Sequence, residues 1–394
     1  MLRRILLSLF SVLLFLLVLE ASSYFLDRAN IRLYWEESYD PGEIWMLDHA
    51  REVALQKNRN GDLARIILKK NYPASISSWL PKLDELNLEP AVQIHSENKS
   101  IFLKPWIMTP NFDDDFTVIG SRSSRLKYKV HYTIDKSGRR IGFEPKKHNQ
   151  TFVFLGCSFT FGTGVNNEES FPYMFGNKTG VRTYNLGVPG SSPATILYRM
   201  RNEKVSLLEN IQGENVTVVL TIIPEHVTRL IGTTHLFRDP MYFKLHPYFY
   251  LSGDKLEMQS SFSSEPGFKK HIISGISRSN FLSVLNFELP FLQENDYLLF
   301  ARVVEEIQNR MKENKKVSRF AVALFPTGRG QAKFDGALKM LKKLNIEVLD
   351  YSFIKSTFML GTSYSLKYDG HPSPLTYDLY TDLLAFDLIR RKEQ

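Results

Sequence analysis

The chain has 394 residues, of which 43% are hydrophobic and 23% charged, with a formal net charge of +8 and one cysteine. This length allows one large domain and a smaller one, while the cysteine count excludes an internal disulfide and, together with the scattered histidines, a structural zinc site. No cofactor motif and no nucleic-acid motif is present, so the positive charge favours an anionic surface rather than nucleic acid as a neighbour.

The N-terminal residues are strongly apolar. After MLRR, residues 5–19 contain only two serines among hydrophobic residues, and the pattern continues past Glu20 to residue 26. As a helix, residues 5–26 would reach about 33 Å, enough to span a bilayer. Arg3 and Arg4 would stay cytoplasmic. We therefore expect residues 1–26 to be a single-pass signal-anchor, with the rest on the outside in a bacterial periplasm or on the cell surface; a cleaved signal peptide is the alternative.

Residues 27–148 are expected to form a membrane-proximal accessory segment of mixed α+β structure. The alternating stretch LKYKVHYTID at 126–135 predicts a strand that enters a turn. NFDDDF at 111–116 is typical of a surface loop.

Residues 149–394 alternate strand and helix patterns. We expect strands at 151–156, 182–188, 215–223, 319–326 and 346–352, and helices at 166–180, 191–210, 297–316, 334–345 and 373–392. This alternation predicts a mainly parallel sheet covered on both faces. In such sheets, sites form outside the carboxyl ends of the strands. Three loops, 156–162, 187–192 and 224–229, therefore converge on one edge.

The first of these loops reads GCSFTFG and carries Ser158. A serine hydroxyl becomes a nucleophile when a histidine takes its proton, a carboxylate orients that histidine, and N–H groups stabilise the oxyanion. The glycine-flanked turn after a buried strand suits an exposed nucleophile. The alternative is that Ser158 only caps the next segment.

A partner for this serine is present near the C-terminus. In LKYDGHPSPLTYDLY, Asp369 and His371 lie two residues apart in a loop before the last helix, so both can point at one site. The alternative is a loop histidine beside a capping aspartate.

Together these stretches resemble the SGNH (GDSL-like) hydrolases, in a membrane-anchored bacterial subgroup. GCSFTFG is similar to their first block, NLGVPGSS at 185–192 to the second, and DGHPSP to the closing one. The resemblance covers roughly residues 150–394. It implies a flavodoxin-like three-layer α/β/α fold, a catalytic triad of Ser158, His371 and Asp369, and backbone oxyanion donors at Ser158 and Gly190. YTIDKSGRR, which begins at Tyr132, belongs to the same resemblance.

Two departures from the family pattern bear on the site. The third block of the family supplies an Asn to the oxyanion hole, whereas the loop here reads IIPEHVTR, which leaves His226 as a candidate donor and Glu225 and Arg229 as candidate substrate contacts. The Asp-x-His spacing is similar to that of carbohydrate O-acetyltransferases in the superfamily, and it favours acyl transfer.

The sequence therefore predicts a serine esterase or O-acyltransferase that acts on acyl esters, chiefly acetyl, of cell-envelope glycan or lipid. No cofactor or metal is expected. The alternative is a non-catalytic protein that keeps the fold as a glycan-binding or assembly module. Cys157 is expected to be a small packing residue, with a catalytic thiol as the minor reading. The substrate, the oligomeric state, and whether Arg139 or Arg140 reaches the site are left open.

Overall fold

The fold is described from a computed structural model of the chain. The residues described are Val18 and 64–68, 92–94, 114–122, 125–135, 137–146 and 150–389, except 203–206, 209, 239, 266, 280, 282–287, 326–330, 352–365 and 367–369.

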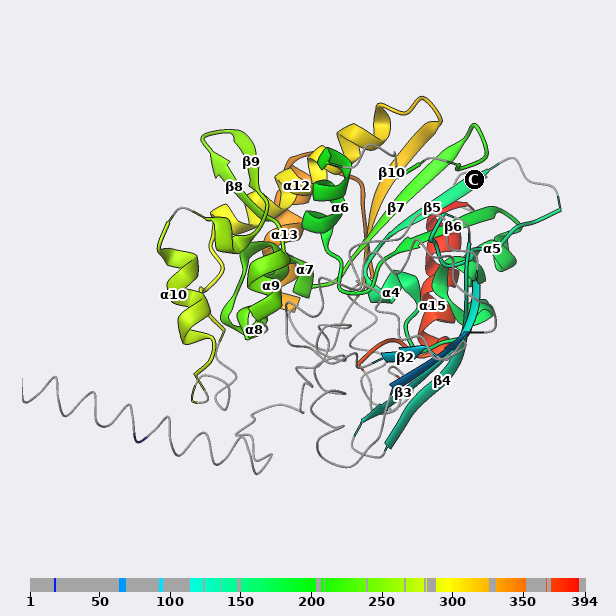
Figure 1. Cartoon of the computed structure of the whole chain (residues 1–394). Coiled ribbons are helices and arrows are strands. Elements are labelled where there is room, and N and C mark those ends of the chain that lie inside the picture. Colours follow the sequence, from blue (N-terminus) through cyan, green and yellow to red (C-terminus); the bar gives the residue numbers. More distant parts are fainter. Residues whose placement is uncertain are drawn as a thin grey trace, which may run out of the picture.

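The centre of the fold is a five-stranded parallel sheet (Figure 1). Its strands are β5 (Thr151–Gly156), β6 (Arg182–Gly187), β7 (Val216–Ile222), β10 (Val317–Leu324) and β11 (Val348–Asp350). They lie in the order β11-β10-β7-β5-β6, and every pair is parallel. Numbered along the chain, this is the 2-1-3-4-5 order of flavodoxin-like sheets. The prediction of a parallel α/β sheet is confirmed.

Helices cover both faces of this sheet (Figure 1). One face carries α6 (Pro193–Asn202), α7 (Glu225–Ile231), α12 (Glu294–Lys312) and α13 (Gln331–Lys343), and the other carries α5 (Phe171–Thr179) and α15 (Pro374–Leu388). Side chains of β5 alternate between the two cores, because successive residues of a strand point to opposite faces. Val153 and Leu155 join the first core, and Phe152 and Phe154 the second. Burial of each such side chain contributes about 1.5–3 kcal/mol.

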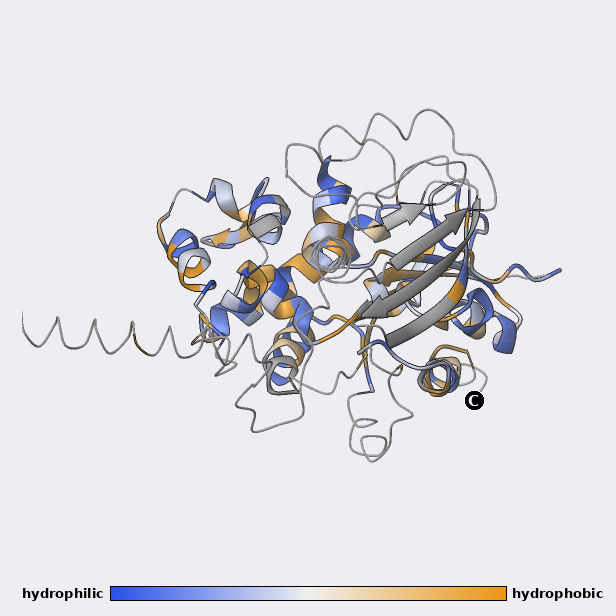
Figure 2. Ribbon diagram, turned by 60° about the horizontal axis from the view of Figure 1, so that its bottom comes forward, coloured by the Kyte–Doolittle hydropathy of each residue, from blue (hydrophilic) through white to orange (hydrophobic). Residues whose placement is uncertain are grey.

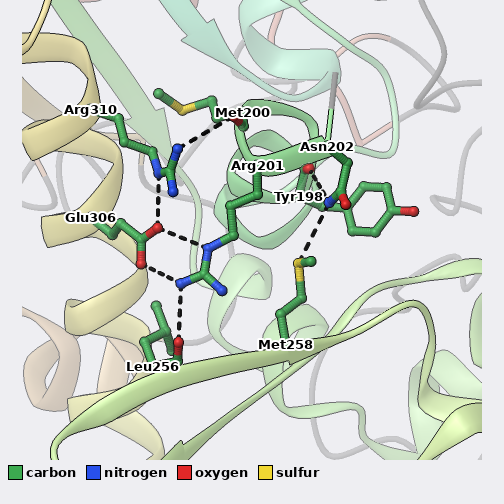
Figure 3. Close-up of polar contacts among 8 residues, drawn as sticks. All are labelled: Tyr198, Met200, Arg201, Asn202, Leu256, Met258, Glu306 and Arg310. Carbon is green, nitrogen blue, oxygen red and sulfur yellow. Dashed lines mark hydrogen bonds and ion pairs between the residues drawn. The ribbon is translucent and has the colours of Figure 1, made fainter. Parts of the chain in front are cut away.

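Some of the covering helices are amphipathic; α12, for example, has buried hydrophobic residues and exposed charged residues along its length (Figure 2). A polar cluster links α6 to α12. Arg201 on α6 bonds to Glu306 on α12 and to the Leu256 carbonyl, and Arg310 donates to the same Glu306 (Figure 3). This cluster lies on the first-core face.

A smaller four-stranded sheet has the order β2-β1-β3-β4. Its strands are β1 (Ala64–Leu68), β2 (Val92–Ile94), β3 (Asp114–Arg122) and β4 (Arg125–Ile134). The strand predicted at 126–135 is confirmed as β4. The surface loop predicted at 111–116 is partly wrong, because residues 114–116 begin β3 and pair with β4. The division of the chain at 148/149 stays a prediction, although β4 reaches the large sheet through bridges of Arg140 to Ile134 and Asn185.

An insertion between β7 and α12 was not anticipated from the sequence. It holds α8 (Thr234–Phe237), α9 (Pro240–Leu245), the hairpin of β8 (Tyr248–Ser252) and β9 (Lys255–Gln259), the 3₁₀ turn η4 (Phe262–Ser264) and α10 (Lys269–Ile276). A small aromatic core around Phe237, Tyr242 and Phe262 holds these pieces together.

The prediction of a membrane-anchored, exported domain is corrected by the structure. A membrane span needs about 20 predominantly apolar residues in one helix, and no helix among the described residues is long and apolar enough to cross a membrane. The 19-residue helix α12, for example, carries charged residues at both ends and between them. The segment on which the prediction rested, residues 5–26, lies outside the described residues apart from Val18.

Candidate active site

Ser158 lies at the carboxyl end of β5, the strand beside the point where the strand order reverses. All six residues of β5 are buried, and after Cys157 the chain enters the short helix α4 (Ser158–Phe161). Ser158 is itself 3% exposed, so the expectation of an exposed serine is not met. The Ser158 carbonyl accepts from the N–H groups of Gly162 (2.9 Å) and Thr163 (3.0 Å). Its own N–H stands in the first turn of α4, where a helix supplies no acceptor. The switch point of such a sheet is where ligands bind.

The glycines that flank this serine let three segments come together. A Cβ on Gly156 would overlap the hydroxyls of Thr160 and Thr221, and a Cβ on Gly187 would overlap the Phe161 backbone nitrogen. Gly162 has φ +83°, a left-handed conformation that favours glycine. Close approach of α4 to the ends of β5 and β6 therefore explains Gly156 and Gly187, and backbone conformation explains Gly162.

The second block forms a buried loop beside the serine turn. The Val188 N–H donates to the Gly156 carbonyl (3.0 Å), and the Ser191 N–H donates to the Val188 carbonyl (3.0 Å). Between them lies Gly190, buried and with φ +75°. This loop thus joins the carboxyl end of β5, as the sequence predicts.

Arg229, on α7, braces the same loop. Its side chain is buried, and Nη1 donates to the Ser191 carbonyl at 2.8 Å. Burial is the main cause of the pKa shifts of three neighbouring groups, downward for His226 and His246 and upward for Cys157. The positive charge of Arg229 adds to the lowering of the pKa at the two histidines and partly offsets the rise at Cys157. A direct contact of Arg229 with substrate stays a prediction.

His226, in the first turn of α7, is fully buried. Its Nδ1 accepts a long hydrogen bond from the Ile223 N–H (3.4 Å), so the ring proton is on Nε2. Within the described part of the chain, Nε2 has no hydrogen-bond partner. Burial, followed by the charges of Arg229 and His246, lowers the pKa of His226 well below 6.5. His226 is therefore a neutral imidazole with an unused buried N–H donor.

Glu225, the first residue of α7, is half-buried. Its carbonyl accepts from the Thr228 hydroxyl at 3.0 Å. A carboxylate in the first turn of a helix is favoured by the unpaired N–H groups there. Its contact with substrate stays a prediction.

His371 is brought to the serine turn by the loop before α15. The side chain is 2% exposed, and its ring lies 5.5 Å, centroid to centroid, from that of Phe159, the residue after Ser158. The Tyr377 hydroxyl on α15 donates to the Phe159 carbonyl at 2.8 Å, which fixes the helix against the same turn. Asp369 lies outside the described residues, so its place in the triad stays a prediction.

Cys157 precedes Ser158 and is 1% exposed. Burial raises the pKa of its thiol, an effect that Arg229 and local hydrogen bonds only partly offset. A neutral, buried thiol is a packing residue rather than a nucleophile.

Sequence reasoning missed one further polar residue at this site. His246, from the insertion, is buried; Nδ1 lies 3.2 Å from the Pro247 carbonyl and Nε2 lies 3.2 Å from the Ser192 hydroxyl. Nδ1 therefore donates to the carbonyl and Nε2 accepts from Ser192. Burial lowers the pKa of His246 to about 3. The signal that could have found it is weak: one histidine within the aromatic stretch YFKLHPYFY.

Known proteins resemble this chain only distantly in sequence and in structure. No family model and no curated protein matches the chain. Solved structures similar to it include a member of the lipolytic G-D-S-L family from Veillonella parvula, with 12% identity over 61% of this chain and 99% of the other, at a TM-score of 0.36. A lipase/acylhydrolase from Enterococcus faecalis has 13% identity over 61% and 96%, at 0.34. An acetylxylan esterase from Geobacillus stearothermophilus has 12% identity over 62% and 94%, at 0.35. Similarity of this extent assigns neither a family nor an activity to the chain.

Proposed function

We propose that this chain is a serine ester hydrolase or O-acyltransferase of the SGNH type, acting on an acyl ester. One observation carries the proposal: Ser158 opens a helical turn at the carboxyl end of a central strand, and the buried His371 packs against the next residue. Nucleophile and base thus come from opposite ends of the domain to the edge where parallel sheets bind ligands.

In the proposed reaction, the Ser158 hydroxyl attacks the acyl carbon and its proton passes to His371. The tetrahedral intermediate collapses to an acyl-serine as His371 returns the proton to the departing alcohol. A second alcohol or a water then gives its proton to His371 and attacks the acyl-serine, which releases the product and restores Ser158. Asp369 would hold the imidazole in the tautomer that accepts the serine proton.

Hydrogen-bond donors from three loops would stabilise the negative charge on the oxyanion of the intermediate. These are the Ser158 and Gly190 N–H groups and the Nε2–H of His226. The unused N–H of a neutral, buried His226 supports this role, because a preorganised donor in a water-poor site costs no reorganisation when charge develops. A histidine would then replace the Asn of the family pattern.

Whether the acyl group passes to water or to another hydroxyl decides between hydrolase and transferase. The Asp-x-His spacing at 369–371 supports transfer, and an O-acetylated glycan is the substrate class that this resemblance suggests. Incubating the protein with an acetylated oligosaccharide and a deacetylated acceptor, followed by mass spectrometry of both, separates acetate release from transfer.

The first test is covalent labelling by a fluorophosphonate, which reacts with activated serines. We expect the wild-type chain to label and Ser158→Ala not to label. Ser261→Ala, which removes a buried serine of the insertion, is the control and should label like the wild type. A folded wild-type protein that does not label would overturn the proposal, and the non-catalytic binding module would then be favoured.

A further inference from the structure

The YTIDKSGRR segment, residues 132–140, lies outside the stretches that carry Ser158, Asp369 and His371, and the proposed function gives it no role. In the structure, it leaves β4 through a tight turn organised by Asp135. The Asp135 carboxylate accepts from the Ser137 N–H (2.8 Å), the Arg139 N–H (3.0 Å) and Arg139 Nε (2.9 Å). The chain then returns, and the backbone of Arg140 bridges Ile134 on one side and Asn185 of β6 on the other. This turn delivers Arg140 to the edge of the large sheet.

The guanidinium of Arg140 is almost fully buried and forms hydrogen bonds to loop 161–167, which follows the serine turn. Nη1 donates to the carbonyls of Phe161 (2.7 Å) and Gly162, Nη2 to the carbonyl of Val165 (2.7 Å), and Nε to the Asn167 side-chain oxygen (3.3 Å). The acceptors are thus three backbone carbonyls and one amide within seven residues. A planar fork with five donors suits such an array, whereas an ammonium group cannot match it.

Two aromatic rings complete the environment of this cation. The guanidinium carbon lies 4.3 Å from the Tyr132 ring centroid and 5.1 Å from that of Phe161. Burial lowers the pKa of Arg140 to about 10, so the side chain is still charged at neutral pH. A buried cation held by carbonyls and rings is expensive to assemble, and its partners must stay in place to satisfy it.

The rest of the segment holds the same loop. The Tyr132 hydroxyl accepts from the Gly164 N–H (2.7 Å), and Asn167 Oδ1 accepts from the Thr133 N–H (3.1 Å). Asn167 begins the 3₁₀ turn η3 (Asn167–Glu169). Residues 161–167 are therefore fixed along their whole length by β4 and the turn that follows it.

This loop is one hydrogen bond away from the proposed nucleophile. Arg140 bonds to the Gly162 carbonyl, and the Gly162 and Thr163 N–H groups both bond to the Ser158 carbonyl. The Phe161 carbonyl is shared with the Asn185 side chain, whose oxygen accepts from the Gly187 N–H at the start of the Gly190 loop. A single side chain thus reaches both backbone segments proposed to bind the oxyanion.

We propose that Arg140 is a positioning residue: it holds loop 161–167 so that the N–H and hydroxyl of Ser158 and the Gly190 loop keep their reactive geometry. This proposal rests on the proposed function of Ser158. If Arg140 has this role, the accessory segment 27–148 contributes a residue that positions the active site of the following domain.

The test compares Arg140→Lys with Arg201→Lys. Arg201 is a partly buried arginine on α6 that also makes several hydrogen bonds, with Glu306 and the Leu256 carbonyl rather than the serine turn as partners (Figure 3). We expect Arg140→Lys to lower kcat on an acetyl ester, and the rate of fluorophosphonate labelling, about 10²-fold with KM little changed, because a displaced nucleophile loses its alignment. Arg201→Lys should keep both rates.

Two further experiments distinguish a positioning role from simple unfolding. Tyr132→Phe removes only the hydroxyl that holds Gly164, and it should slow labelling severalfold in a folded protein. For Arg140→Ala, guanidinium ion at a non-denaturing concentration should restore part of the labelling rate, whereas the matched Arg201→Ala should not respond. If Arg140 only stabilised the fold, we would expect neither the slower labelling of Tyr132→Phe nor the rescue of Arg140→Ala by guanidinium ion.

The outcomes separate this inference from the function on which it rests. If the wild type labels, and folded Arg140→Lys and Tyr132→Phe label at the wild-type rate, the positioning role is wrong while the function stands. If the wild type does not label, the proposed function is wrong. Amide hydrogen exchange then tests whether Arg140 holds loop 161–167 in place. Faster exchange at Gly162, Thr163 and Gly164 in Arg140→Lys, but not in Arg201→Lys, supports the hold on the loop, and unchanged exchange overturns it.

Discussion

The ring of His371 lies against the ring of Phe159, with 5.5 Å between centroids and 52° between planes. Phe159 is 3% exposed and directly follows Ser158 in α4. Close packing restricts the imidazole to few orientations. The alignment of the proposed base with the proposed nucleophile therefore depends on a hydrophobic side chain that takes no part in the chemistry.

Phe159→Leu should separate alignment from stability. The smaller side chain fills much of the same volume, so we expect a loss of about 1 kcal/mol in the free energy of unfolding. The loosened His371 should lower kcat about tenfold or more. Urea unfolding and ester hydrolysis measure the two effects. Phe175→Leu, in the same core but on α5, is the control; an equal fall of kcat there would contradict the role of the Phe159–His371 contact.

His226 can be tested by keeping or removing its donor. His226→Leu should lower kcat by about 10²–10³, the usual cost of one oxyanion donor, and His226→Asn, which retains an N–H donor, should lose less. Because the pKa of His226 lies well below 6.5, the acid limb of the pH–rate profile should not move in either variant. Equal rates in the wild type and His226→Leu would exclude it from the oxyanion hole.

Acidification should destabilise the fold through His246. Its pKa is about 3 in the native state against 6.5 ordinarily, so below pH 6.5 the unfolded chain binds the extra proton and stability is lost as the pH falls towards 3. This amounts to about 2 kcal/mol between pH 7 and pH 5. His246→Phe, which keeps the stacking on Tyr242, should show a shallower loss in urea unfolding at these two pH values. An unchanged slope would rule out His246 as the source.

Gly187→Ala should disturb the contact between β6 and the serine turn. The added Cβ would overlap the Phe161 backbone nitrogen, so we expect a loss of about 1–3 kcal/mol in stability together with slower labelling of Ser158. Gly275→Ala is the matched control, since its Cβ meets nothing within 4 Å on the exposed side of α10. That change should stabilise the helix by about 0.5–1 kcal/mol. Thermal unfolding of the two variants in parallel tests both expectations.

The large sheet could be predicted because its signals are local. The apolar run of 151–156 is β5, residues 215–223 contain β7, and the amphipathic stretch at 297–316 overlaps most of α12. Strand and helix periodicities follow from backbone geometry, so they are readable without tertiary contacts. The insertion around α8 to α10 was missed, since its elements are short and are held by aromatic contacts among themselves.

The sequence by itself determined where a reactive serine could stand: the strand before Ser158, its flanking glycines, and the loop with His371 all carry local patterns. The tertiary structure alone decided what surrounds it. Arg140 and His246 lie 18 and 88 residues from Ser158 in the sequence, and no pattern there indicated that Arg140 would bond to the loop after the serine turn or His246 to Ser192. Burial in the folded chain lowers the pKa of His246, because desolvation depends on neighbours that only the fold brings together. The fold likewise leaves the Nε2–H of His226 without a partner among the described residues and brings Arg140 to its hydrogen-bond acceptors.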